Sequence, residues 1–246
     1  MIDLNPNLTG RTALVTGSAK RVGREVLLNL ADAGADVAVH YRESKTEAEE
    51  TADAARDLGA RATTVQGDIT VSQEVDSLVE DCESTLGSVD ILINTVGPFP
   101  RGNWDELSFN EWKRTIEGCL YGTYLCSQRV LPAMRQEEWG RIINFGVADA
   151  RDDHSLPLNF PYFAAKKAVL MFTRALAYDT QYDGITVNTV SPFVVENSVV
   201  DVVDLPRNRP ASFEDVAAPI LFFCSDAASY LSGQNIAVDG GRLHEA

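Results

Sequence analysis

Seven short runs rich in β-branched residues alternate with longer segments of helical periodicity, and this alternation constrains the fold of the chain most. The runs are at residues 12–16, 36–41, 62–66, 90–95, 141–145, 184–190 and 235–239. Most are apolar throughout, as strands covered on both faces of a parallel sheet should be. We therefore predict an α/β fold of Rossmann type, a doubly wound, seven-stranded parallel sheet flanked by helices. Residues 1–246 are expected to form a single domain.

The balance of charge argues against several classes of partner. The chain has 36 acidic and 21 basic residues, for a net charge of −15, which disfavours binding to nucleic acid or to an acidic membrane surface. The first residues, "MIDLNPNLTGR", contain no apolar run of the kind found in a signal peptide. We expect a cytoplasmic protein without a membrane anchor. The acidic excess fits either adaptation to concentrated salt or ordinary colloidal solubility.

Cysteines and histidines give no sign of a metal site. The four cysteines occur without a C-x-x-C pair, so buried free thiols are the favoured interpretation. The three histidines, His40, His154 and His244, are far apart in the sequence. We predict no metal.

A glycine-containing turn, "TGSAKRVG" (residues 16–23), follows the first strand and precedes a helix. In a dinucleotide-binding turn, the first glycine adopts a backbone conformation closed to other residues. The second lets the helix N-terminus approach a diphosphate. Gly17 and Gly23 occupy these positions, so the turn predicts a dinucleotide cofactor.

The end of the second strand indicates which dinucleotide it is. An Asp or Glu there would accept hydrogen bonds from the ribose hydroxyls of NAD, but the chain reads "VHYRES" (residues 39–44), with Arg42 and no acid at His40 or Tyr41. We expect Arg21 and Arg42 to converge on a 2′-phosphate through charge-assisted hydrogen bonds. The predicted cofactor is NADP(H). Glu43 is an unfavourable neighbour for a bound phosphate. The alternative is that Arg21 and Arg42 are only solvated surface charges.

Further short motifs follow the later strands: "GDIT" (67–70), "NTVG" (94–97), "YFAAK" (162–166), "SPF" (191–193) and "VDGG" (238–241). In this order and spacing they resemble the short-chain dehydrogenase/reductase family over nearly the whole chain. "TGSAKRVG" and "VHYRES" look most like the pteridine reductases, and the 3-oxoacyl-carrier-protein reductases are the next most similar. The resemblance implies an NADP(H)-dependent oxidoreductase that forms a homodimer or homotetramer.

The resemblance also implies a set of cofactor contacts by position. They are Gly17, Ser18, Lys20, Arg21, Val22, Gly23, Tyr41, Arg42, Ser44, Asp68, Ile69, Asn94, Gly97, Tyr162, Lys166, Pro192 and Val195.

Tyr162 and Lys166 are four residues apart and should share one face of a helix. An ammonium beside a phenol, whose ordinary pKa is about 10, stabilises the phenolate and lowers that pKa. Tyr162 is then able to donate a proton to a carbonyl oxygen while the nicotinamide delivers hydride. Lys166 would also hold the nicotinamide ribose.

Two positions depart from the family pattern. The family's serine falls at Val147 when counted from the fifth strand and at Asp149 when counted back from Tyr162. Pteridine reductases carry an aspartate there, which favours Asp149 as the catalytic group, and Ser155 is a weaker candidate. The family's helix asparagine falls at Cys119, a poor hydrogen-bonding group, so the proton relay is weakened, rerouted or absent.

Phe99, Val147 and Phe193 are the expected substrate contacts. Phe99 is placed either to stack on a flat substrate or only to pack, and residues 193–210 are expected to form a lid. The predicted function is hydride transfer to a carbonyl or conjugated C=N group of a small molecule, pterin-like or a ketone. A 3-oxoacyl thioester reductase is the alternative enzyme, for which Arg101, Arg207 and Arg209 would supply basic surface. A non-catalytic NADP(H)-binding regulator is the alternative from another class.

Overall fold

Seven parallel strands form one sheet in a computed structural model that describes residues 6–148, 158–198 and 204–242. The strand order is β3-β2-β1-β4-β5-β6-β7. The bounds are β1 (Thr12–Thr16), β2 (Asp36–Tyr41), β3 (Ala62–Gln66), β4 (Ile91–Asn94), β5 (Gly140–Phe145), β6 (Ile185–Pro192) and β7 (Asn235–Val238). Asp149, Ser155, His154 and His244 lie outside the described residues.

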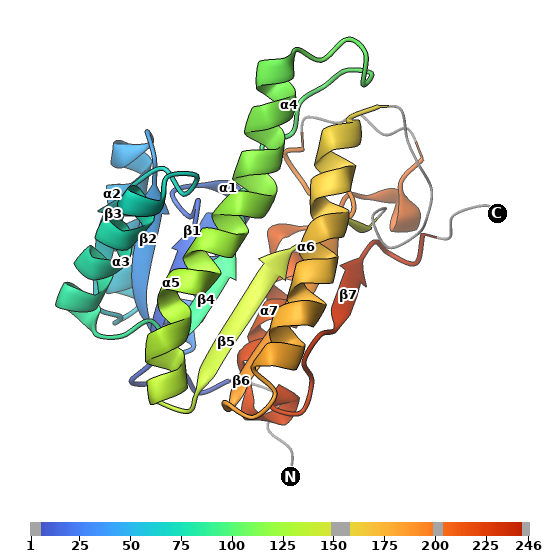
Figure 1. Cartoon of the computed structure of the whole chain (residues 1–246). Coiled ribbons are helices and arrows are strands. Elements are labelled where there is room, and N and C mark those ends of the chain that lie inside the picture. Colours follow the sequence, from blue (N-terminus) through green and yellow to red (C-terminus); the bar gives the residue numbers. More distant parts are fainter. Residues whose placement is uncertain (1–5, 149–157, 199–203, 243–246) are drawn as a thin grey trace.

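Helices cover both faces of this sheet (Figure 1). Buried side chains of α1 (Arg21–Asp32), α2 (Lys45–Asp57) and α7 (Phe213–Cys224) join one core cluster. Those of α3 (Ser72–Leu86), α5 (Gly122–Gln136) and α6 (Phe160–Asp179) join a second. Shorter helices are α4 (Phe109–Ile116), the π-helical turn η1 (Glu117–Tyr121), η3 (Pro206–Asn208) and η4 (Asp226–Ala228). The result is a three-layer sandwich.

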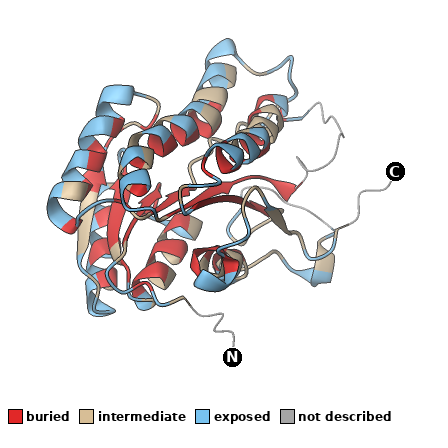
Figure 2. Ribbon diagram, turned by 60° about the horizontal axis from the view of Figure 1, so that its bottom comes forward, coloured by how far each residue is buried: buried red, intermediate tan, exposed pale blue. Residues whose placement is uncertain are grey.

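The sheet itself is the interior of the molecule, coloured as buried in Figure 2. Every residue of β1, β4, β5 and β6 is buried. Such strands must be apolar on both faces because helices cover both sides. This explains why the runs in the sequence are continuous rather than alternating.

The predicted fold class is confirmed. β1, β2 and β3 have the expected bounds, and the other strands differ from expectation by one or two residues at an end. β6 runs two residues further than expected because Ser191 and Pro192 pair with Ala237 and Val238 of β7. Since all strands are parallel, their carboxyl ends share one edge of the sheet, and the strand order reverses between β1 and β4. Ligands of such sheets bind in the crevice at that point.

The described ranges bear on two predictions from composition, the state of the cysteines and the lack of a membrane anchor. Cys82, Cys119, Cys126 and Cys224 are buried free thiols, as expected. In the same ranges, no helix has both the length and the apolar character that crossing a bilayer requires.

Candidate active site

Two cavities lie beyond the carboxyl ends of the strands. We name the first, of about 480 Å³, the glycine-turn cavity; its wall includes Gly17, Tyr41 and Asp68. The second, of about 850 Å³, is the tyrosine cavity; its wall includes Tyr162 and Lys166. The predicted site residues in the glycine-turn cavity are Gly17, Lys20, Tyr41, Arg42, Ser44, Asp68 and Ile69. Those in the tyrosine cavity are Arg21, Val22, Phe99, Gly97, Val147, Tyr162, Lys166, Pro192, Phe193 and Val195.

The glycine-containing turn is packed tightly against the start of α1. A Cβ added at Gly23 would lie 2.6 Å from the carbonyl oxygen of Gly17. No side chain fits there without moving the backbone, so the sequence needs glycine at position 23. Gly23 therefore shapes the turn and lines neither cavity wall itself.

A histidine that was not assigned to the site fixes this turn. The imidazole of His40, at the end of β2, accepts a hydrogen bond at Nδ1 from the Gly17 N–H (2.8 Å). Its Nε2 is 3.0 Å from the carbonyl oxygen of Gly67. Because Nδ1 accepts, the proton must be on Nε2, which donates to Gly67. Burial lowers the pKa of His40, which favours this neutral form.

Arg21 and Arg42 do not converge in this structure, contrary to expectation. Arg42 lines the glycine-turn cavity and contacts Asp68 (3.3 Å) and Glu43 (3.0 Å). Arg21 has a positive φ of 57° and lines the tyrosine cavity, where its guanidinium donates to the carbonyl oxygen of Asn197 (3.0 Å). The cation that shares the glycine-turn cavity with Arg42 is Lys20, which is 3.4 Å from Glu47. Although Lys20 and Arg21 are neighbours at the start of α1, Lys20 lines the glycine-turn cavity and Arg21 lines the tyrosine cavity.

Two other predicted contacts have structural partners instead. The Ser18 hydroxyl donates to the carbonyl oxygen of Val15 (2.7 Å) and accepts from the His40 N–H (3.1 Å). The Asn94 side chain donates to the Oδ1 of Asn144 (2.9 Å) on the neighbouring strand. Neither residue lines either cavity. Both side chains are buried and bonded to neighbouring segments, which holds the strand ends in place, while the Oδ1 of Asn94 makes no hydrogen bond within the described part of the chain.

Tyr162 and Lys166 lie on the first turns of α6 and face the same cavity, as the spacing predicted. The Lys166 ammonium is 5.8 Å from the centre of the Tyr162 ring. It donates a hydrogen bond to the carbonyl oxygen of Phe145, at the end of β5 (2.7 Å). This bond orients a lysine that is otherwise buried from solvent.

The electrostatics of this pair differ from the simple expectation. Desolvation by burial raises the pKa of the Tyr162 phenol, and the nearby Cys119 thiol raises it further. Desolvation likewise lowers the pKa of Lys166. Without ligands, burial therefore dominates over any stabilisation of the phenolate by the ammonium.

Cys119 is buried beside this pair, in the π-helical turn η1. Its Sγ is 3.9 Å from the carbonyl oxygen of Pro98, a weak contact. A Cβ added at Gly97 would lie 3.2 Å from the Nζ of Lys166 and 3.5 Å from the Sγ of Cys119. Gly97 thus leaves room for the lysine, and Cys119 offers only a thiol where an amide would be a strong hydrogen-bonding group.

The three predicted substrate contacts all line the tyrosine cavity. The ring of Phe99 meets that of Tyr162 edge to face, with centroids 4.8 Å apart. Val147 is buried and packs in a small cluster with Leu170. Phe193 lies under the guanidinium of Arg242, whose carbon is 4.0 Å from the ring centre. In this geometry Phe99 packs on Tyr162, which favours the packing alternative.

Sequence reasoning missed several residues of the site, among them Asn159 and Arg242, which both line the tyrosine cavity. Asn159 is the N-cap residue of α6 and has a positive φ of 55°, so helical spacing from Tyr162 could not identify it. Arg242 gave no local signal, because only the folded C-terminal segment brings it to Phe193.

Comparisons with known proteins agree with this geometry. A family model described as enoyl-(acyl carrier protein) reductase matches residues 17–242. A 3-oxoacyl-acyl-carrier-protein reductase of Staphylococcus epidermidis is 32% identical over 242 residues, covering 94% of this chain and 98% of that protein.

Two solved structures are similar along their whole length. A 7α-hydroxysteroid dehydrogenase complexed with NADH and 7-oxo glycochenodeoxycholic acid has a TM-score of 0.91 and 29% identity, covering 100% of this chain and 99% of that one. A gluconate 5-dehydrogenase from Burkholderia cenocepacia, in complex with NADP and tartrate, has a TM-score of 0.89 and 28% identity, covering 97% of each chain. Together with the Tyr162–Lys166 pair at the carboxyl edge of the sheet, these matches assign the chain to the short-chain dehydrogenase/reductase family of oxidoreductases.

Proposed function

We propose that this oxidoreductase uses NADP(H) to transfer hydride to a ketone carbonyl of a small molecule. The observation that carries the proposal is that Tyr162 and Lys166, from one face of α6, line a cavity of about 850 Å³ beside the glycine-containing turn. A cavity of this size suits a ligand of several hundred daltons.

The residues around the end of β2 fit a cofactor with a 2′-phosphate. Lys20, Arg42 and Ser44 line the glycine-turn cavity, and β2 ends in Tyr41 rather than in an acid. Two cations and a hydroxyl favour a phosphate, whereas the ribose hydroxyls of NAD would need an acceptor there. The bound NADP of the gluconate dehydrogenase and the bound NADH of the hydroxysteroid dehydrogenase illustrate both options on this fold. The cations support NADP(H) for this chain.

Tyr162 and Lys166 have separate roles in this reaction. When bound, the reduced cofactor supplies hydride to the carbonyl carbon. Tyr162 gives its phenolic proton to the carbonyl oxygen. Lys166, held by the Phe145 carbonyl, orients the nicotinamide ribose and supplies positive charge that favours release of the Tyr162 proton.

For the substrate, we favour a 3-oxoacyl thioester as the first candidate, because the relative at 32% identity is named for that activity. The wall of the cavity is consistent with such an amphipathic molecule: it combines Phe99, Phe163 and Phe193 with the exposed or half-exposed cations Arg101 and Arg242. A pterin-like substrate stays the second candidate, on the strength of the "VHYRES" motif.

The test is a screen of NADPH oxidation at 340 nm. Acetoacetyl-CoA, 2,3-butanedione, a dihydropterin and a quinone serve as probes, each in low and molar potassium chloride. Turnover of acetoacetyl-CoA or 2,3-butanedione that is lost in Tyr162→Phe supports the proposal. A wild-type protein that binds NADPH but reduces none of the probes, and that is indistinguishable from Tyr162→Phe, would favour the regulator hypothesis.

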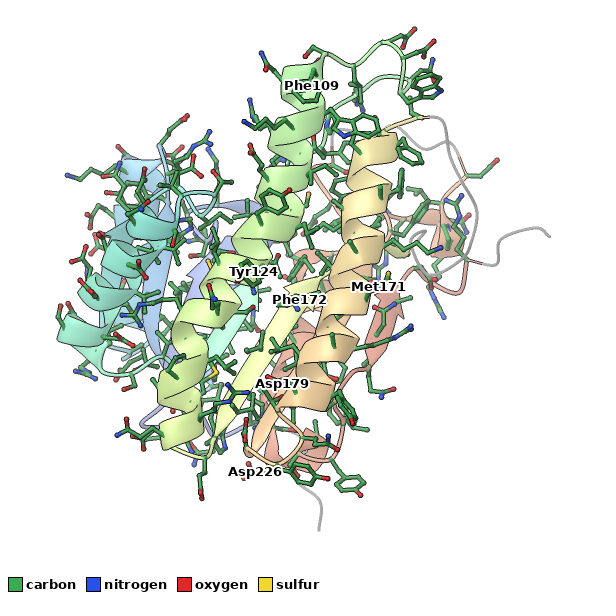
Figure 3. All side chains as sticks on the ribbon, in the orientation of Figure 1. Phe109, Tyr124, Met171, Phe172, Asp179 and Asp226 are labelled. Atoms are coloured by element: carbon green, nitrogen blue, oxygen red, sulfur yellow. The ribbon has the colours of Figure 1, made fainter. Side chains whose placement is uncertain are left out.

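We also propose that the chain forms a homodimer through α5 and α6. A homotetramer is the larger assembly that this interface could be part of. Figure 3 labels Tyr124 on α5 and Met171 and Phe172 on α6, and the rings of Tyr124 and Phe172 meet edge to face with centroids 6.1 Å apart. Met171 is 67% exposed and Tyr178, two turns further along α6, is 77% exposed. Large apolar side chains gathered on two adjacent helices are typical of a protein interface.

Light scattering after gel filtration tests this interface. The Met171→Glu variant should be more monomeric than the wild type, because the substitution places a charge in the apolar contact. Leu58→Glu, at an exposed apolar side chain at the end of α2 on the other face of the sheet, is the matched control and should leave the mass unchanged. A monomeric wild type would contradict the interface.

A further inference from the structure

Asn159 is the described residue best arranged to replace the missing serine of this family. The first alignment of that serine falls on Val147, whose buried side chain has no hydrogen-bond donor. The tyrosine cavity still needs a group that binds the substrate oxygen, since charge develops there as hydride arrives.

Asn159 is held rigidly at the N-terminus of α6. Its backbone N–H donates to the carbonyl oxygen of Gly102 (2.9 Å), and its Oδ1 accepts from the Gly102 N–H (3.2 Å). The residue has a positive φ of 55° and is 3% exposed. Asparagine is among the few residues with a side chain that adopt this conformation readily. The reciprocal pair of bonds ties the loop that carries Phe99 to the helix that carries Tyr162.

These bonds also orient the carboxamide. Because Oδ1 accepts from the Gly102 N–H, the amide orientation is fixed and Nδ2 is the remaining donor of a residue that lines the tyrosine cavity together with Tyr162 and Lys166. Within the described part of the chain, Nδ2 makes no hydrogen bond. The backbone carbonyl of Asn159 accepts from the N–H of Tyr162 (3.0 Å), so the two residues are one turn apart along the backbone.

We propose that the Nδ2 amide of Asn159 is a catalytic hydrogen-bond donor to the substrate oxygen, an inference that rests on the proposed ketone reduction. The bound NADPH would supply the hydride of the new C–H bond, with the carbonyl π electrons moving onto oxygen. Tyr162 transfers its proton to that oxygen, which gives the alcohol and NADP⁺. Asn159 transfers no proton; it stabilises the negative charge on oxygen before the proton arrives.

Asn159→Asp separates the two functions of this side chain. An aspartate keeps an oxygen that accepts from the Gly102 N–H, so the loop stays tied, but at pH 8 it has no donor for the substrate. We expect kcat for the probe ketone with the highest wild-type turnover to fall by about 10²–10³-fold, the usual effect of losing one such donor. The Kd for NADPH, measured by fluorescence, should stay within about twofold, since the amide acts mainly in the transition state.

The pH profile distinguishes a donor from a merely structural side chain. As pH falls, the new carboxyl group protonates and regains an O–H donor. The ratio of variant to wild-type kcat should therefore rise towards acid pH. Asn103→Asp, at an exposed neighbouring position, is the matched control for added charge and should show neither loss nor recovery.

The outcomes separate this inference from the proposed function and from the alternative at Asp149. Wild-type turnover with an unchanged kcat in Asn159→Asp would overturn the inference and leave the reductase intact. So would a flat ratio across pH, because a structural role would not depend on protonation. Loss of turnover in Asp149→Ala but not in Asn159→Asp would assign the role to Asp149. Absence of turnover in the wild type overturns both proposals.

Discussion

The two cavities along the carboxyl edge of the sheet are built by different means. The glycine-turn cavity is lined by the ends of β1, β2 and β3, by the turns that follow them, and by residues of the loop after β4, of α4 and of η1. His40 connects two of these turns through hydrogen bonds to Gly17 and Gly67. The tyrosine cavity combines β5, β6 and α6 with the loops that carry Phe99 and Phe193. The first is built mainly around three strand ends and the short turns that follow them, and the second around α6 and loops that are distant in the sequence.

This difference explains where the chain follows its family and where it departs. The strand ends hold the motif residues in a fixed geometry, so a change there would disturb the cofactor site directly. By the alignment expected from the sequence, the family's serine falls at Val147 or Asp149 and its asparagine at Cys119, whereas Tyr162 and Lys166 match the family motif; of these residues, Val147, Tyr162 and Lys166 line the tyrosine cavity.

The largest expected effect is in the tyrosine cavity. Tyr162→Phe removes the proton donor and should lower kcat by about 10²–10⁴-fold, while the Kd for NADPH changes little because the phenol acts mainly in the transition state. Lys166→Ala should damage both quantities, since the ammonium serves cofactor and tyrosine together. Steady-state kinetics and fluorescence titration measure the two effects. Equal effects of both variants on the Kd would show that the tyrosine also holds the cofactor.

The next effect is in the glycine-turn cavity. Arg42→Asp should weaken NADPH binding by about ten- to a hundredfold, since a charge-assisted hydrogen bond contributes about 1.5–3 kcal/mol, and should leave NADH binding nearly unchanged. Titration of both cofactors measures the selectivity. Arg21→Ala is the matched control: because Arg21 lines the other cavity, it should not change the preference for NADPH. An equal loss for both cofactors in Arg42→Asp would contradict the 2′-phosphate assignment.

A smaller, pH-dependent effect comes from His40. Its pKa is lowered from the ordinary 6.5 by burial, so below pH 6.5 the unfolded chain binds a proton that the folded chain does not. The free energy of unfolding should then fall as pH decreases, by up to about 1.4 kcal/mol per pH unit from this group. Chemical denaturation between pH 7.5 and 5.5 measures the slope.

His40→Asn is the comparison for that slope. The variant should be less stable at pH 7.5, since it loses the bonds to Gly17 and Gly67, and its stability should depend less on pH. His154 and His244 are present in both proteins, so their contributions to the pH dependence cancel in the comparison. The same slope in both proteins would show that His40 is not the titrating group.

The smallest effect concerns Cys119. Cys119→Ser replaces one small side chain with another beside Lys166 and should change kcat by no more than about threefold, because the thiol makes only a weak contact with Pro98. Turnover of the wild type and the variant under identical conditions checks this. A large loss would mean that the thiol takes part in proton transfer after all.

Much of the fold and part of the site could be predicted from the sequence because their signals are local. Continuous apolar runs gave the strands, the interval of four residues placed Tyr162 and Lys166 on one face of α6, and Gly17 and Gly23 marked the turn after β1. Each of these patterns depends on backbone periodicity or on the conformational range of a single residue. Neither requires knowledge of contacts between distant segments.

Only the tertiary structure decided which groups meet. Arg21 and Lys20 are adjacent in sequence, yet one lines the tyrosine cavity and the other the glycine-turn cavity. His40 acquires its tautomer from Gly17 and Gly67, and the orientation of the Asn159 amide comes from Gly102, 57 residues away. A hydrogen bond between distant segments depends on how the loops close across the sheet, and the local sequence of either segment does not encode that.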